Sequence, residues 1–180
     1  MISFNSEDIQ FNLKYKTKLK GWIVKTIESK KKKAGDISFV FCSDAFLLEM
    51  NKEYLNHDTY TDIITFDYSS DLSAKGKGFS TPLEVTTKGA KSKMTKTVAP
   101  ISGDIFISID RVQENADKFS PIGSAQGDKQ RKKSSNFEDE LHRVIIHGVL
   151  HLLGYKDKTK IAKTEMTKQE DSCLKAFKKS

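Results

Sequence analysis

The 180-residue sequence has only two cysteines, three prolines and ten glycines. Two cysteines, Cys42 and Cys173, exclude a disulfide framework, and so few prolines and glycines exclude a collagen-like or low-complexity chain. The most apolar segment, residues 144–153, is interrupted by two histidines. It is too short to be a membrane-spanning helix, which needs about 20 apolar residues. The first residues also lack the basic start and apolar run of a signal peptide. We therefore expect a reduced, cytoplasmic protein with no membrane partner.

The positive charge of the chain is concentrated in two stretches. Lysines and arginines number 31 against 24 acidic residues, a formal net charge of +7. Residues 71–100 carry +4 of this and residues 120–136 carry +3, so the remainder of the chain sums to zero. Both stretches have a loop-like composition, which predicts basic loop insertions in a single domain spanning residues 1–180. Such a charge favours an anionic partner, although a solvated surface loop explains it equally well.

Hydrophobic periodicity predicts strands and helices mixed along one chain. Alternating or continuous β-branched and aromatic residues predict strands at residues 2–4, 37–42, 62–68 and 103–109. Apolar residues spaced three and four apart predict helices at about 9–31, 44–54, 110–119, 137–153 and 164–179. Ser43 and Asp110 are candidate helix caps, and Ser135 with Glu138 is a candidate capping box. This order predicts an α/β or α+β domain with a mixed, roughly four-stranded sheet and about five helices.

Two histidines interrupt the most apolar of these helices. His147 and His151 are four residues apart, so they project from one helical face within reach of a single ion. A helix apolar nearly all round is buried, and there an unpaired polar group costs about 1–3 kcal/mol. Satisfied core histidines are the alternative. The spacing favours a site for a metal such as zinc on a buried helix.

A carboxylate supplies a candidate third ligand. Gly154 is a suitable residue to end the helix, and Asp157 follows six residues after His151. Three protein ligands leave a fourth position open for water, as in catalytic sites. The alternative is that Asp157 only caps the turn and water completes the shell. Gly148 stands where zinc peptidases of the HExxH kind have their glutamate base, which argues against a peptidase of that type.

Residues 147–157 (HGVLHLLGYKD) resemble the HGxLHLxGYDH hallmark of the YbeY family of metal-dependent endoribonucleases. Residues 51–66 (NKEYLNHDTYTDIITF) are similar to the family pattern NxxYRxxdxpTDVLSF, and the GDI at 103–105 and Glu165–Met166 also match in order. The resemblance implies a compact α/β domain with one zinc ion held by His147, His151 and the residue at 157. It also implies cleavage of single-stranded RNA, maturation of the 16S rRNA 3′ end and ribosome quality control.

The sequence departs from the family pattern at two positions. Asp157 replaces a histidine, which adds a negative charge to the site, makes a bound water less acidic and favours harder ions somewhat. Leu55 replaces an arginine associated with RNA phosphate in the family; His57 and Lys52 are candidate substitutes. Asp62, Thr65 and Asp104 match motifs that line the family's cleft, although acidic strand ends also satisfy backbone amides. A solvated first-turn role is expected for Glu140, and His142 is expected to face away from His147.

We therefore predict a zinc-dependent, single-strand-specific endoribonuclease that acts on rRNA, with the ribosome or ribosomal proteins as partners. Two alternatives stay open. One is a ribosome-associated assembly factor with little turnover of its own, whose basic insertions bind rRNA or a ribosomal protein. The other is a metal-dependent hydrolase of a different substrate. The nucleophile, a water or the 2′-hydroxyl of the RNA, is open as well.

Overall fold

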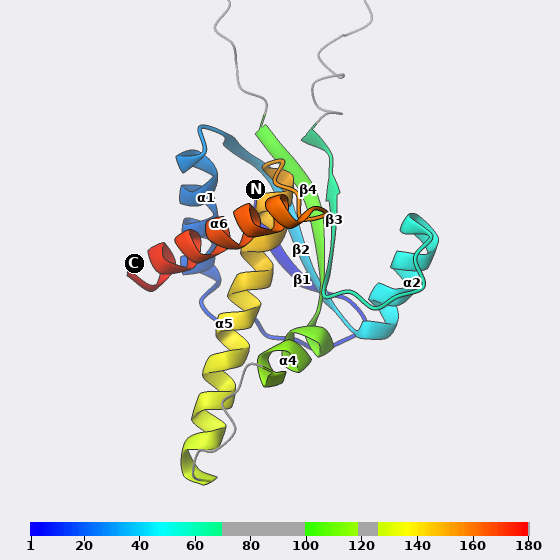
Figure 1. Ribbon diagram of the computed structural model, residues 1–180, viewed down its shortest axis with the longest axis vertical. Helices are drawn as coiled ribbons and strands as arrows, with labels where there is room; N and C mark the ends of the chain where they lie inside the picture. Colours follow the sequence, from blue (N-terminus) through cyan, green and yellow to red (C-terminus); the bar gives the residue numbers. More distant parts are fainter. Residues whose placement is uncertain (70–99, 119–125, 180) are drawn as a thin grey trace, which may run out of the picture.

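The computed structural model describes residues 1–69, 100–118 and 126–179, with residues 126–135 described by their backbone only. Within these residues the chain forms four strands and five helices (Figure 1). The first basic stretch, 71–100, lies outside the described residues except for Pro100, where a strand begins. The predicted mixed sheet of four strands packed with helices in a single domain is confirmed.

The sheet has the strand order β1-β2-β4-β3. The strands are β1 (Ile2–Ser6), β2 (Lys33–Cys42), β3 (Ile63–Asp67) and β4 (Pro100–Ser108). Strand β2 pairs in parallel with β1 and β4, and β3 closes the edge antiparallel to β4. Phe39 is in register with Ile105, which faces Thr65 across the antiparallel pair. Because side chains alternate between faces, these three residues share one face of the sheet.

Helices α1 (Lys16–Ser29), α5 (Gln126–Leu152) and α6 (Lys160–Lys179) belong to the main core. Figure 1 shows α5 running along the sheet with α6 crossing it. Alternate strand residues such as Phe39 and Ile105 pack in the same buried cluster as Ile145 of α5. Trp22 of α1 donates its indole N–H to the carbonyl of Cys173 in α6 at 3.0 Å. The hydrogen bond joins α1 to α6, and the buried cluster packs α5 against the sheet.

Helix α2 (Asp44–Leu55) packs on the opposite face, and α4 (Ile109–Lys118) follows β4 directly. A second, smaller cluster joins Leu47 of α2 to Cys42 and Ile64. Cys42 is completely buried, and burial raises the pKa of its thiol to about 12. Cys173 is buried as well, and both cysteines are free thiols. This second cluster lies on one face of the sheet. Helix α5, which carries His147 and His151, packs on the other face, with Phe39 and Ile105.

Two details at the helix starts differ from the sequence prediction. The first helix begins at Lys16 instead of residue 9, because Tyr15 adopts a left-handed conformation (φ 55°) that a helix cannot continue through. Ser43 caps α2 as predicted, since its Oγ accepts from the Phe46 N–H at 3.2 Å. The predicted cap Asp110 is wrong. Ser108 takes that place, because its Oγ accepts from the Arg111 N–H at 3.1 Å.

Helix α5 starts eleven residues earlier than the predicted residue 137. It begins at Gln126, so the second basic stretch, 120–136, is helical from that residue on and the loop prediction there is wrong. Ser135 lies inside the helix, so the predicted capping box is also wrong. Residues 126–136 include no apolar side chains, so the sequence has no hydrophobic periodicity there that would predict a helix. In Figure 1 this first part of α5 extends beyond the sheet.

Candidate metal centre

His147 and His151 lie on successive turns at the C-terminal end of α5, and their Nε2 atoms are 2.9 Å apart. The helix ends where Gly154 takes a positive φ of 93°, a conformation that glycine adopts without steric cost. The Gly154 and Tyr155 N–H groups donate to the carbonyls of His151 and Leu150. These bonds close the helix end and turn the chain back toward the two histidines.

The Nδ1 atom of each histidine is already engaged. His147 Nδ1 lies 2.5 Å from Glu170 Oε1, and His151 Nδ1 lies 3.0 Å from the carbonyl oxygen of Tyr155. Since an ionised carboxylate and a carbonyl only accept, both Nδ1 atoms carry the hydrogen. Each neutral ring then has its lone pair on Nε2. Two lone pairs facing each other at 2.9 Å repel unless a cation or a proton lies with them.

Asp157 completes a cluster of three ligating groups. Its Oδ2 lies 3.8 Å from His147 Nε2 and 4.0 Å from His151 Nε2. All three ligand atoms fall within 4.8 Å of one another. Asp157 therefore lies beside the two histidines, where the sequence predicted a third ligand.

The donor set fits a metal ion. Ligand atoms bound tetrahedrally at about 2.0–2.1 Å from zinc lie about 3.3 Å apart. The observed separations of 2.9, 3.8 and 4.0 Å bracket that value. Two imidazoles and one carboxylate are ligands that zinc accepts, and a three-ligand site leaves a further position open. Helix α5 and the turn after it therefore bring three ligating side chains close enough together to hold one divalent ion.

A chain of buried charges supports this cluster from behind. Glu170 of α6 is only 5% exposed and reaches His147 through its Oε1. Its second oxygen, Oε2, lies 3.7 Å from Arg143 Nη1. Arg143 donates to both oxygens of Glu140, at 2.7 and 2.8 Å, and its Nη2 is 3.5 Å from Asp62. Glu140 and the other acidic neighbours raise the pKa of Arg143, which holds the guanidinium charged.

Burial lowers the pKa of His151, and the neighbouring His147 acts in the same direction. A neutral imidazole is the form that binds a metal. The site environment therefore favours the binding-competent form of His151 near neutral pH.

The structure brings only some of the predicted cleft residues to this side. Asp62 contacts Arg143, one helical turn before His147. Thr65 is on the sheet face that α5 covers, and its buried Oγ1 has no hydrogen-bond partner among the described residues. Asp104 is on the opposite face, in register with Phe66, and accepts from the Tyr68 hydroxyl at 3.2 Å.

Three residues near the end of α2 are exposed. Leu55, which stands at the position of the family's arginine, ends α2 and is 45% exposed. His57 is exposed two residues later and donates its backbone N–H to the Asn51 carbonyl. Lys52 pairs with Asp58 at 2.8 Å. His57 and Lys52 are therefore both surface residues near the C-terminal end of α2.

The sequence reasoning was wrong about Glu140 and missed two other residues. Glu140 is 7% exposed and paired with Arg143, so the prediction of a solvated first-turn acid does not hold. His142 contacts the rings of Trp22 and Phe177 on another side of α5. Glu170 and Arg143 were missed. The sequence signal that Glu170 faces inward is its helical spacing from Met166, four residues before it, and from Cys173, three residues after it.

Comparison with known proteins decides the family. The family model described as endoribonuclease YbeY matches residues 1–178. The chain belongs to this family. An endoribonuclease YbeY from Flavobacterium psychrophilum is 41% identical over 177 residues, covering 98% of this chain and 96% of the relative. An endoribonuclease YbeY from Cytophaga hutchinsonii is 39% identical over 173 residues, covering 96% and 93%. The predicted membership of the YbeY family is confirmed.

A solved structure supports the fold. The solution structure of a Thermotoga maritima protein aligns with a TM-score of 0.52 at 21% identity, covering 98% of this chain and 89% of the other. At this identity the likeness shows the fold alone. The relatives are named for an RNA-cleaving hydrolase activity, so the YbeY family is a family of enzymes.

Proposed function

We propose that the protein is a zinc-dependent endoribonuclease that cleaves single-stranded RNA during late rRNA processing, including maturation of the 16S rRNA 3′ end. One observation carries the proposal. The Nε2 atoms of His147 and His151 face each other at 2.9 Å while both Nδ1 atoms donate elsewhere, and Asp157 lies beside them. In a chain of the YbeY family, this geometry supports a cation-binding role for the three side chains.

The residues divide the work at the site. His147, His151 and Asp157 hold the ion, and Glu170 orients the His147 ring through Nδ1. When bound, the ion polarises a phosphoryl oxygen and lowers the pKa of a bound water. Gly148 leaves no glutamate base beside His147, so proton removal falls to another group or to the RNA itself. A water and the 2′-hydroxyl both remain compatible nucleophiles.

Zinc is the proposed ion because two of the three ligands are imidazoles, which suit zinc better than magnesium or calcium. Asp157 adds an anionic oxygen, which favours harder ions somewhat. We propose one ion per chain. Elemental analysis of the purified protein measures both its identity and its stoichiometry.

The proposed partners are rRNA and the ribosome in the cytoplasm, where the protein would also serve ribosome quality control. The formal charge of +7 supports an anionic substrate. Within the described residues, no helix combines the length and apolar character that a membrane crossing needs. Co-sedimentation with ribosomal subunits, with and without salt washing, tests the association.

Cleavage of a labelled single-stranded RNA tests the proposed activity. We expect wild-type protein to cut it and the folded His147→Ala, His151→Ala double variant to lose cutting by at least a hundredfold together with its metal. Asp157→Ala should retain less metal than the wild type. Asp139→Asn, which changes a half-exposed carboxylate on the same helix, is the control. Undiminished cutting by the folded double variant would refute the metal mechanism. Activity on a small ester without activity on RNA would favour another hydrolase.

A further inference from the structure

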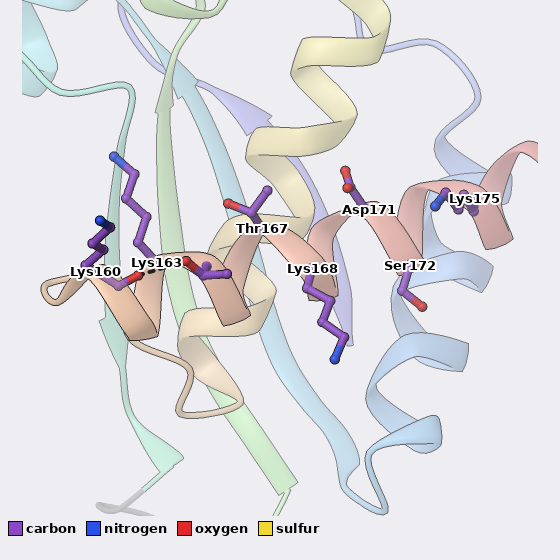
Figure 2. Close-up of a pocket in the computed structure, with 8 residues that line it drawn as sticks. Lys160, Lys163, Thr167, Lys168, Asp171, Ser172 and Lys175 are labelled. Atoms are coloured by element: carbon purple, nitrogen blue, oxygen red, sulfur yellow. Dashed lines mark hydrogen bonds between the residues drawn. The ribbon is translucent and has the colours of Figure 1, made fainter.

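A row of lysines runs along the outward side of α6. Figure 2 shows Lys160 and Lys163 near the start of the helix, Lys168 near its middle and Lys175 further along. We call these four exposed residues the α6 lysine face. They line a hollow of about 640 Å³ in which every described lining residue is polar. The other lining residues are Thr164, Thr167, Asp171 and Ser172.

The α6 lysine face lacks the carboxylate partners that other surface lysines have. Lys14, Lys118 and Lys178 form ion pairs of 2.9 to 3.1 Å with Glu138, Glu114 and Asp139. Among the described residues, no ion pair joins a lysine of the face to a carboxylate. Among the described residues that line the hollow, Asp171 is the one acidic residue. The described lining of the hollow therefore has a net formal charge of +3.

A groove between α1 and α6 extends this surface. It has a volume of about 360 Å³ and shares Ser172 with the hollow. Lys18, Lys25 and Lys30 line it. Lys30 donates to the neutral side chain of Gln169, so its charge is also uncompensated. Hollow and groove together carry seven lysines and one aspartate, a net formal charge of +6.

The surface adjoins the candidate metal centre. Lys160 follows Asp157 by three residues, and the exposed Lys156 and Lys158 flank Asp157. The same helix presents Glu170 to His147 on its inner side. From Lys160 to Lys175 the face is about 22 Å long at 1.5 Å per residue. That is the length of about six nucleotides at the 3.4 Å spacing of a stacked strand.

We propose that the α6 lysine face, with the α1–α6 groove, binds the phosphate backbone of the RNA substrate outside the metal centre. This inference rests on the proposed endoribonuclease function and identifies where that substrate lies. Lysine ammonium groups and threonine or serine hydroxyls contact phosphates without reading bases. The surface therefore supplies affinity without sequence preference. An acidic protein segment is the competing occupant, but the cores of protein interfaces are enriched in aromatic residues and methionine and depleted in lysine, whereas four of the eight described residues lining the hollow are lysines.

The test compares two triple variants of equal charge in the zinc-loaded protein. Lys163→Gln, Lys168→Gln, Lys175→Gln removes three lysines from the face. Lys14→Gln, Lys118→Gln, Lys178→Gln removes three paired lysines elsewhere. The probe is a fluorescent 12-nucleotide 2′-O-methyl oligouridylate, whose integrity is checked on a gel. Its anisotropy gives Kd between 50 and 200 mM KCl.

We expect the face variant to bind at least tenfold more weakly at 50 mM KCl. Its slope of log affinity against log salt should fall by about 2, at about 0.7 per phosphate contact. The control variant should change Kd by less than threefold. An equal loss in both variants would mean that only net charge matters, and no loss in the face variant would remove the surface from RNA binding. Either result overturns the proposal.

Two further measurements separate the remaining outcomes. Binding of a fluorescent oligoglutamate at the face more tightly than the oligouridylate would assign the surface to an acidic protein and overturn the RNA proposal. Cleavage of an unmodified RNA by the wild type is measured separately. If the wild type cuts RNA but the face variant binds normally, the nuclease stands and the surface fails. If binding depends on the face but no RNA is cut, the surface stands and the nuclease fails.

Discussion

His147 Nδ1 and Glu170 Oε1 are 2.5 Å apart, although the two residues lie on different helices and 23 positions apart in the sequence. The contact fixes which nitrogen of His147 carries the hydrogen, because the carboxylate accepts. It also turns the ring so that Nε2 faces His151 and Asp157. A carboxylate behind a ligating histidine raises the basicity of that ligand. In the proposed metal site, affinity for the ion should therefore depend on how α6 docks on α5.

Replacing this carboxylate should weaken metal binding. Glu170→Gln removes the negative charge behind His147, and loss of such a partner costs about 10–100-fold in metal affinity. Competition with a chromogenic zinc chelator measures the change. Asp171→Asn, an exposed carboxylate one residue on, is the matched control and should leave affinity unchanged. Equal affinity of Glu170→Gln and wild type would show that the contact does not support the ion.

Arg143 should be essential for stability. Glu140 and Glu170 are 7% and 5% exposed, and Arg143→Met leaves both without their cation. Removing one partner from a buried ion pair costs about 3–5 kcal/mol. Urea unfolding measures the loss, and Arg143→Lys should recover part of it. Lys14→Met breaks a largely exposed pair and should change the free energy of unfolding far less than Arg143→Met does. Similar costs for the two methionine variants would contradict this account.

Gly148 and Gly21 should respond in opposite ways to alanine. A Cβ at Gly148 would lie 2.8 Å from Ile105 Cγ2 and from Ile63 Cδ1, so these side chains or α5 must shift. Such overpacking costs about 1–3 kcal/mol. A Cβ at Gly21 meets nothing within 4 Å, so Gly21→Ala should stabilise α1 by about 0.5–1 kcal/mol. Thermal unfolding of both variants checks the signs, and a stabilised Gly148→Ala would refute the close packing.

His142 should make the protein sensitive to acid. Burial lowers the pKa of His142 below its ordinary value, although Asp139 and Glu138 oppose the shift. The unfolded chain then binds more protons than the folded one below about pH 6.5. Stability must therefore fall as the pH drops from 7 through this range. Urea unfolding at pH 7.5 and 5.5 should show a smaller loss in His142→Gln than in the wild type. An equal loss in both would place the acid sensitivity elsewhere.

Local patterns were sufficient for part of the site. The four-residue spacing of His147 and His151 puts two imidazoles on one face of any helix, whatever the helix packs against. Gly154 and Asp157 follow closely enough for the turn to bring the carboxylate back, and the structure places Asp157 Oδ2 within 4.0 Å of both rings. That these three residues bind zinc remains a prediction.

Other features depend on contacts between segments far apart in the chain. Glu140 was predicted to be a solvated first-turn acid because the helix was expected to begin at about residue 137. Helix α5 begins at Gln126 instead, and Glu140 is buried and paired with Arg143. Thr65 and Asp104 both match cleft motifs, yet the pleat and the β3–β4 register put them on opposite faces of the sheet. The sequence of one strand does not by itself determine its register with the neighbouring strand.

The sequence by itself predicted the mixed α/β fold, the resemblance to the YbeY family and the two-histidine helix, since these depend on local patterns and on their order along the chain. Only the tertiary structure decided that Glu170 stands behind His147, that Arg143 links Glu140 to Glu170, and that α5 begins at Gln126. The physical reason is the distance along the chain over which each feature is set. The face of a helix on which a residue lies depends on its spacing from residues three or four positions away. Burial and charge pairing depend instead on where α6 and the sheet contact α5.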